Sequence, residues 1–130
     1  MGDQSGIVAC HLTLGLLAHE SGDLAAAAAH YARASTVADQ CGNLVDSCII
    51  ETNLGLLRTD QDRDPEAVGH HATALAIRLR LDLPDKDVDA EALYQLRNRL
   101  GRTRFEELAR EQLDTESVVE LTGILDVRPS

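Results

Sequence analysis

The sequence predicts an all-α fold in which antiparallel helical hairpins stack as a short solenoid of about six to seven helices. Aromatic residues make up only 2% of the chain and Trp is absent, so the core must use small and aliphatic side chains, which suits closely packed helices. No alternating run and no Asn-Gly or Asp-Gly turn indicates a β-hairpin. Leu14-Gly15 recurs as Leu54-Gly55, and a repeat at a fixed period is typical of units that bury their apolar faces by stacking.

The first hairpin is expected after the polar residues 1–6. Apolar side chains cover most sides of a helix over residues 7–20, which predicts neighbouring helices on more than one side of it. Gly22 suits the left-handed residue after this helix, and Asp23 suits the N-cap of the next one. The second helix, over residues 24–40, is rich in Ala. Its expected inward stripe consists of Leu24, Ala27, Tyr31, Ala34, Ala38 and Cys41.

A second hairpin of the same kind is expected over residues 44–81. Its first helix, over residues 44–59, repeats the apolar pattern of the first hairpin. Asp64, Pro65 and Glu66 are typical of a helix start, with an N-cap, a proline at the first helical position and an acid in the first turn. Pro84 then prevents the helix from continuing.

The last third of the chain predicts three shorter helices. One covers residues 88–100 and ends at Gly101, a second begins at a capping box formed by Thr103 and Glu106, and a third covers residues 115–125. With 130 residues the chain has room for one domain. We therefore expect a single domain over residues 1–130, with two hairpins in 7–83, a degenerate third hairpin in 87–113 and a capping helix in 115–125.

The internal repeat extends beyond the two Leu-Gly pairs. The positions 12, 16 and 19 residues after each glycine hold a small, a larger and a small side chain. Small side chains let two helices cross closely, and the larger one fills the gap between hairpins. The residues expected to pack within and between the repeats are Leu14, Gly15, Ala27, Tyr31, Ala34, Leu54, Gly55, Ala67, His71 and Ala74.

This pattern resembles the tetratricopeptide repeat, which has Leu-Gly in its first helix and Ala-x-x-x-aromatic in its second. The chain departs from the family pattern at His11 and Glu51, at Ala18 and Arg58, and at Asp39 and Leu79, where the family prefers Trp, Tyr and Pro. Leu14 and Leu54 are 40 residues apart, whereas the usual period is 34. The longer period resembles the long-helix variants found in bacterial regulators and signalling ATPases.

The resemblance implies a function in protein binding. Family members use the first helix of each hairpin to line a concave groove for a peptide or a partner helix. The groove residues that it implies here are Leu12, Leu16, His19, Ile49, Thr52 and Leu56. The positions three before and one after each Leu-Gly glycine face the groove in the family, and here they hold Leu12, Leu16, Thr52 and Leu56. The absence of Lys, Arg and Asn from these positions argues against a clamp for a terminal carboxylate, and the three leucines favour an apolar ligand helix. The alternative is that residues 88–125 fold back over this groove.

The charge of the chain narrows the class of partner. A formal charge of −10 disfavours nucleic acid and anionic membranes, so we expect a protein or peptide partner, with self-association as an open alternative. No apolar run is long enough for a bilayer and no signal peptide opens the chain. Three cysteines without a paired spacing are typical of a reduced, cytoplasmic setting, which is the localisation we expect.

Other candidate sites have simpler interpretations. His70 and His71 are adjacent, and adjacent residues on a helix do not face each other, so one metal ion cannot easily bind both. His71 occupies the aromatic position of the repeat and is interpreted as a core residue. Cys41 and Cys48 complete no zinc spacing. The acidic loop over residues 60–66 and the arginines over residues 97–104 are interpreted as solvated, paired faces. No cofactor motif or nucleophile–base pattern occurs.

The leading hypothesis is therefore a non-enzymatic adaptor that binds a peptide or helix in an apolar groove and needs no cofactor. A second is that the chain is the C-terminal regulatory repeat region of a larger bacterial signalling ATPase or transcriptional regulator. A third is a small enzyme or metal protein built around His70 and His71. A fourth is self-association through the exposed end of the stack.

Overall fold

A computed structural model describes residues 4–127 of the chain. Within this range it contains seven α-helices and no strand, so the all-α prediction is confirmed. The helices are α1 (Gln4–Glu20), α2 (Leu24–Cys41), α3 (Leu44–Asp60), α4 (Asp64–Arg80), α5 (Lys86–Leu100), α6 (Arg102–Gln112) and α7 (Thr115–Asp126).

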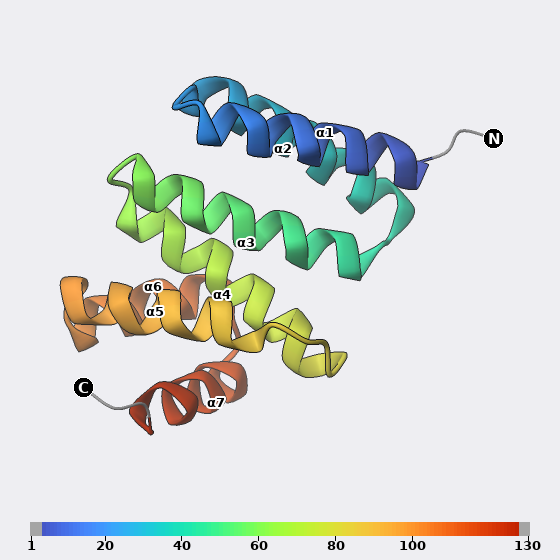
Figure 1. Ribbon diagram of the computed structural model, residues 1–130. Helices are drawn as coiled ribbons and strands as arrows, with labels where there is room; N and C mark the ends of the chain where they lie inside the picture. The colour runs from blue at the N-terminus through green and yellow to red at the C-terminus, as the bar shows by residue number, and fades with distance from the viewer. Residues whose placement is uncertain (1–3, 128–130) are drawn as a thin grey trace.

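Successive helices pack against each other in chain order. Helices α1 and α2 form one hairpin, α3 and α4 form the next, and α2 packs against α3 to join them. Helix α4 contacts both α5 and α6, and α7 packs against these two at the opposite end of the molecule from α1 (Figure 1). The apolar core accordingly falls into two clusters, one between α1, α2 and α3 and one between α4, α5, α6 and α7.

A left-handed residue ends each of the first four helices, at intervals of 20 residues. These residues are Gly22, Gly42, Asp62 and Asp82, with φ of 86°, 65°, 60° and 50°. After each of them, a backbone N–H donates to the carbonyl oxygen five residues earlier, as in Asp23 to Ala18 at 2.9 Å. This is the Schellman closure of a helix C-terminus. The 40-residue period therefore consists of two helix-plus-turn units of equal length.

Two of these four turns place Asp where Gly is best suited, which leads to a stability prediction. We expect Asp62→Gly to raise the free energy of unfolding by about 0.5–1 kcal/mol, because a side chain with positive φ is sterically strained. Asp82→Gly is the matched comparison, with a smaller gain, because Asp82 also accepts a hydrogen bond from Lys86 at 2.6 Å. Urea denaturation of both variants measures the difference, and an equal or larger gain for Asp82→Gly would contradict it.

The helix starts differ in part from the expectation. Asp23 and Asn43 cap α2 and α3, each accepting a hydrogen bond from a backbone N–H. Asp64 is not an N-cap but the first residue of α4, where its carboxylate pairs with Arg99. The expected capping box at Thr103 is wrong as well, since α6 already begins at Arg102. Gly101 alone connects α5 to α6 through its positive φ, so no capping side chain is present there.

Helix α1 does not have the neighbours that its apolar sequence predicts. Leu14 was expected to pack within the repeat, but 40% of it is exposed. The other nine residues expected to pack are buried. Leu14 is not part of the apolar cluster that α1, α2 and α3 form. Its counterpart Leu54 is 7% exposed, because α2 covers α3 on the corresponding side.

Candidate functional site

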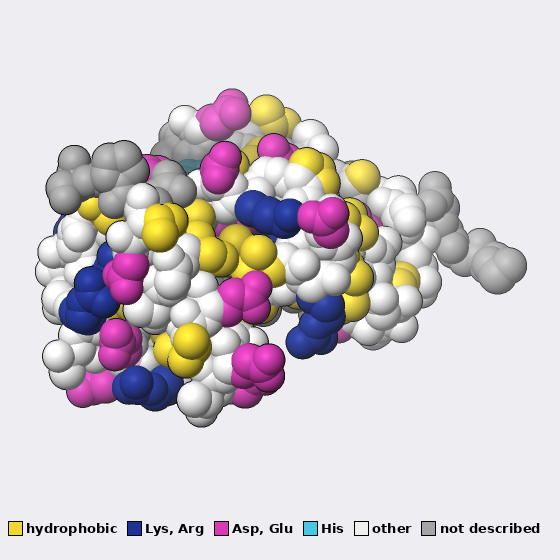
Figure 2. Space-filling model, turned by 90° about the horizontal axis from the view of Figure 1, so that it is seen from below, with side chains coloured by type: hydrophobic (Ala, Val, Ile, Leu, Met, Phe, Trp, Pro, Cys, Tyr) yellow, Lys and Arg dark blue, Asp and Glu magenta, His cyan; other side chains and the backbone are white. Residues whose placement is uncertain are grey.

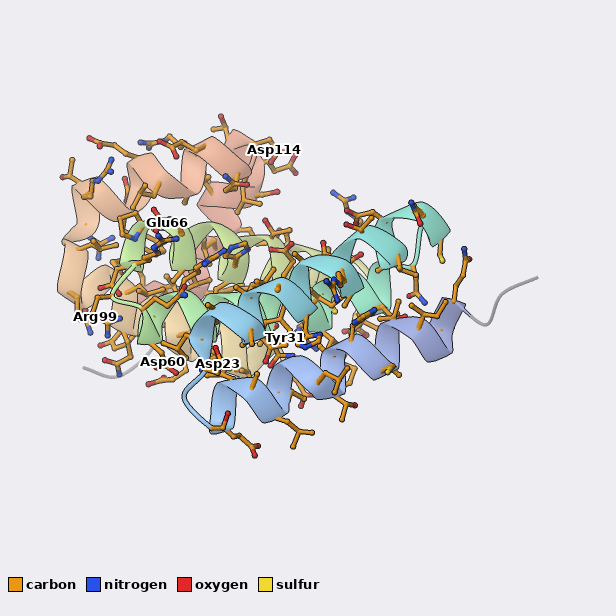
Figure 3. All side chains as sticks on the ribbon, turned by 90° about the horizontal axis from the view of Figure 1, so that it is seen from above. Asp23, Tyr31, Asp60, Glu66, Arg99 and Asp114 are labelled. Atoms are coloured by element: carbon orange, nitrogen blue, oxygen red, sulfur yellow. The ribbon has the colours of Figure 1, made fainter. Side chains whose placement is uncertain are left out.

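Two glycines bring the helices of each hairpin together. A Cβ atom on Gly15 would lie 2.5 Å from Cε1 of Tyr31, and a Cβ atom on Gly55 would likewise overlap the ring of His71. Both rings are fully buried, and Tyr31 lies between α1 and α2 (Figure 3). The repeat thus pairs a glycine on the first helix with a ring on the second, and it uses the glycine for close approach rather than for an unusual backbone conformation.

The surface of α1 and α3 carries the expected groove residues. Leu16 and Leu56 follow the two packed glycines at equivalent positions, and they are 39% and 41% exposed. Leu12 and Ile49 are half-buried beside them. We call this surface, defined by Leu12, Leu16, Ile49 and Leu56, the leucine face. Helices α1 and α3 lie side by side along it (Figure 1).

His19 has a structural partner on the same side of the molecule. Its Nε2 atom lies 2.6 Å from Oδ2 of Asp60, and the two side chains are 17% and 58% exposed. Asp60 is the last residue of α3, and Asp23, labelled with it in Figure 3, follows the end of α1. The contact therefore ties the C-terminal ends of α1 and α3 together, and His19 borders the leucine face through this pair.

Thr52 is not a groove residue, which corrects the expectation. It is 7% exposed, and its hydroxyl lies 3.0 Å and 3.1 Å from the two carboxyl oxygens of Asp89 in α5. The first turn of α5 therefore covers this part of α3. The alternative that residues 88–125 cover the whole groove does not hold, since Leu16 and Leu56 stay exposed.

Asp89 is the centre of a buried polar cluster that was not among the predicted sites. Its Oδ1 atom accepts a hydrogen bond from Nδ1 of His71 at 2.8 Å, and its Oδ2 atom pairs with Nε of Arg78 at 3.1 Å. The side chains of His71 and Asp89 are completely buried. We call Thr52, His71, Arg78 and Asp89 the Asp89 cluster. The cluster joins α3, α4 and α5. Its internal hydrogen bonds and ion pair replace the hydrogen bonds to water that each buried group loses on folding.

The internal repeat does contain a signal for this cluster. Forty residues before its four members stand apolar side chains, in the order Leu12, Tyr31, Ala38 and Ile49. Leu12, Tyr31 and Ala38 belong to the apolar cluster of the first hairpin. The second unit thus replaces several apolar repeat positions by polar ones at once. Polar residues at several positions whose repeat counterparts are apolar predict that these polar residues bind each other.

The geometry of the Asp89 cluster is structural rather than catalytic. A His–Asp pair is typical of general-base sites, but a base must reach the proton that it removes. Nε2 of His71 is buried against Gly55 and has no hydrogen-bond partner. Because no part of His71 is exposed, a substrate cannot reach this nitrogen.

His70 points to a different part of the molecule. Its Nδ1 atom lies 2.7 Å from Oε2 of Glu51, and both side chains are about a quarter exposed. The pair borders a polar pocket of about 550 Å³ between α3, α4 and α6. The pocket is lined by Glu51, Pro65, Glu66, Gly69, His70, Thr73, Arg104, Leu108, Glu111 and Gln112. Across residues 4–127, no three His, Cys, Asp or Glu side chains are grouped to hold a metal ion.

The four arginines between residues 97 and 104 are paired. Arg97 and Arg102 both bind Asp126, at 2.7 Å and 3.1 Å, and these hydrogen bonds hold the pKa of that carboxyl below its usual range. Arg99 pairs with Asp64 and Arg104 pairs with Glu107. As expected for paired faces, this region offers no concentrated positive charge to an anion.

The cysteines divide into one buried and two exposed thiols. Cys48 is buried in α3, where its thiol donates to the carbonyl oxygen of Val45 at 3.1 Å, and burial raises the pKa of this thiol. Cys41, which was expected on the inward stripe of α2, is exposed instead, and Cys10 is exposed as well.

None of the helices between residues 4 and 127 combines the length and apolar character needed to cross a bilayer. Comparisons of the chain with protein-family models, curated proteins and solved structures give no match.

Proposed function

We propose that this chain is a non-enzymatic protein-interaction module that binds a peptide or a partner helix on the leucine face. The observation that carries this proposal is the exposure of Leu16 and Leu56, at 39% and 41%, on neighbouring helices. Both follow a buried glycine that fixes the position of their helix against its partner. Large apolar side chains at rigid, equivalent positions favour a ligand that buries a stripe of its own apolar residues.

The leucine face and the net charge of the chain together indicate the chemistry of the partner. An amphipathic helix or extended peptide supplies apolar side chains to Leu16 and Leu56. The chain carries a net charge of −10, and complementary charge favours association, so a partner with Lys or Arg beside its apolar stripe associates fastest. The likeness of the repeat to the tetratricopeptide family supports the same kind of partner, and membership of that family remains a proposal, as does a cytoplasmic location.

The remaining hypotheses have less support. An enzyme built around His70 and His71 needs one accessible site for both residues, but one ring is buried on Asp89 and the other pairs with Glu51. A regulatory repeat region of a larger protein is compatible with the leucine face, because such a region also acts by binding another protein.

The test is capture of partners by the wild-type chain and by a Leu16→Asp/Leu56→Asp double variant, identified by mass spectrometry. Both leucines are exposed, so the introduced carboxylates are solvated in the unbound chain and the helices stay folded. Circular dichroism checks that the helical content is unchanged. We expect the double variant to bind the captured partner with about 100-fold lower affinity, because two carboxylates in an apolar interface remain unpaired.

Leu81→Asp is the matched control, since Leu81 is 40% exposed directly after α4 and is not part of the leucine face. It should capture the same proteins as the wild type. Equal capture by the folded double variant would exclude the leucine face as the binding site.

A further inference from the structure

A second apolar surface lies on the outer side of α1. Ile7, Leu14 and Leu17 are 43%, 40% and 57% exposed, and Cys10 is exposed between them. Their spacing of three, four and three residues places all four on one side of a helix. We call this set the α1 stripe. It differs from the leucine face, since Leu16 lies about 160° around the helix from Leu14 in the ideal α-helical projection.

Three residues of α3 at the repeat positions equivalent to the α1 stripe are buried against another helix. Forty residues after Cys10, Leu14 and Leu17 stand Ile50, Leu54 and Leu57 of α3. These three are 1%, 7% and 0% exposed because α2 packs over them. The α1 stripe therefore has the composition and spacing of a helix-packing surface, but its residues are exposed in the described structure.

The charge distribution favours a second copy of the chain as the cover. Two molecules of charge −10 repel each other unless they meet through a neutral surface. In α1, no Asp, Glu, Lys or Arg precedes Glu20, the last residue of the helix. By contrast, acidic and basic side chains are interspersed over the end that carries α7 (Figure 2). Contact through α1 thus brings no like charges of the two copies together at the α1 stripe itself.

The spacing of the stripe is also self-complementary. Ile7 and Leu17 lie equally far from residue 12, as do Cys10 and Leu14. When two α1 helices run antiparallel about a two-fold axis that crosses the stripe at the level of residue 12 along the helix, Ile7 of each copy faces Leu17 of the other, and Cys10 faces Leu14. A two-fold interface requires this reciprocity, in which residue i contacts j and j contacts i.

We propose that two copies of the chain form a homodimer through antiparallel pairing of their α1 stripes. The leucine face stays outside this interface, so the dimer presents two partner-binding surfaces. If a helical hairpin of a different chain covers the α1 stripe instead, the isolated chain is a monomer. The following experiments distinguish the homodimer from this alternative.

The first experiment is sedimentation equilibrium of the 130-residue chain, which has a mass of 14.1 kDa. We expect a dimer at tens of micromolar, a range in which a helix-pair interface is populated. Leu14→Glu/Leu17→Glu should be monomeric with an unchanged circular dichroism spectrum. Val119→Glu, at a position 67% exposed on α7, should remain dimeric. A monomeric wild type overturns the proposal, as does a dimer that only Val119→Glu disrupts.

The second experiment tests the register by oxidation in a Cys41→Ser background, which removes the other exposed thiol. Leu14→Cys places a thiol opposite Cys10 of the second copy, so we expect rapid formation of a disulfide-linked dimer. Ala9→Cys, also exposed but on another side of α1, is the control and should cross-link slowly. Cys10 alone should cross-link slowly too, because the two Cys10 residues are offset by about 6 Å along the axis. Fast linkage of Cys10 alone indicates a parallel pair and overturns the antiparallel register.

Discussion

Replacing Asp89 by Ala is expected to lower the free energy of unfolding by about 3–5 kcal/mol, the cost of removing one partner from a buried ion pair. The carboxyl group is completely buried and binds His71, Arg78 and Thr52 at once. Without it, these groups stay buried and lose a shared acceptor. Urea denaturation followed by circular dichroism measures the loss.

Asp87→Ala is the matched control for this prediction. Asp87 lies in the same first turn of α5 but is exposed, so its replacement should change stability by no more than about 0.5 kcal/mol. A variant that introduces the apolar repeat counterparts together, Thr52→Leu, His71→Tyr, Arg78→Ala and Asp89→Ile, should be more stable than Asp89→Ala alone, because it leaves no buried charge unpaired. If Asp89→Ala costs no more than Asp87→Ala, the Asp89 cluster does not hold α5 in place.

Replacing Gly55 by Ala is expected to cost about 1–3 kcal/mol, as overpacking of a filled core does. The new methyl group would overlap the ring of His71, which Asp89 holds from its other edge. The ring and α3 cannot separate without disturbing the Asp89 cluster. Gly15→Ala should be destabilising for the same reason, since its methyl group would meet the buried ring of Tyr31.

Gly123→Ala provides the opposite result as a control. Gly123 lies inside α7, and a Cβ atom there would meet nothing within 4 Å. Alanine is about 1 kcal/mol better than glycine inside a helix, so this variant should be more stable than the wild type. If all three substitutions stabilise the protein, the close approach at Gly15 and Gly55 is not a packing requirement.

Local sequence signals were sufficient to predict most of the secondary structure. Gly22 and Gly42 end α1 and α2 as expected, and Asp23 caps α2 through its side chain. These features depend on residues within one turn of each other, which the sequence displays directly. The same left-handed turn at Asp62 and Asp82 was not predicted, because Asp adopts that conformation less readily than Gly.

The Asp89 cluster was harder to predict than the leucine face because it depends on contacts between distant residues. Thr52 and Asp89 are 37 residues apart, and neither resembles a core residue by itself. Their burial follows from the position of α5, which no local pattern specifies. The prediction that Leu14 is buried was wrong because local sequence suggested a contact that the fold does not make. Its sequence context matches that of buried Leu54, but no preceding hairpin covers α1 in the described structure.

Hydrogen–deuterium exchange with and without a captured partner tests most directly whether the leucine face is the binding surface. We expect bound partner to slow exchange in α1 and α3 around Leu16 and Leu56, and to leave α6 and α7 unchanged. Protection confined to the helices from α4 to α7, with none in α1 or α3, would contradict the proposed function.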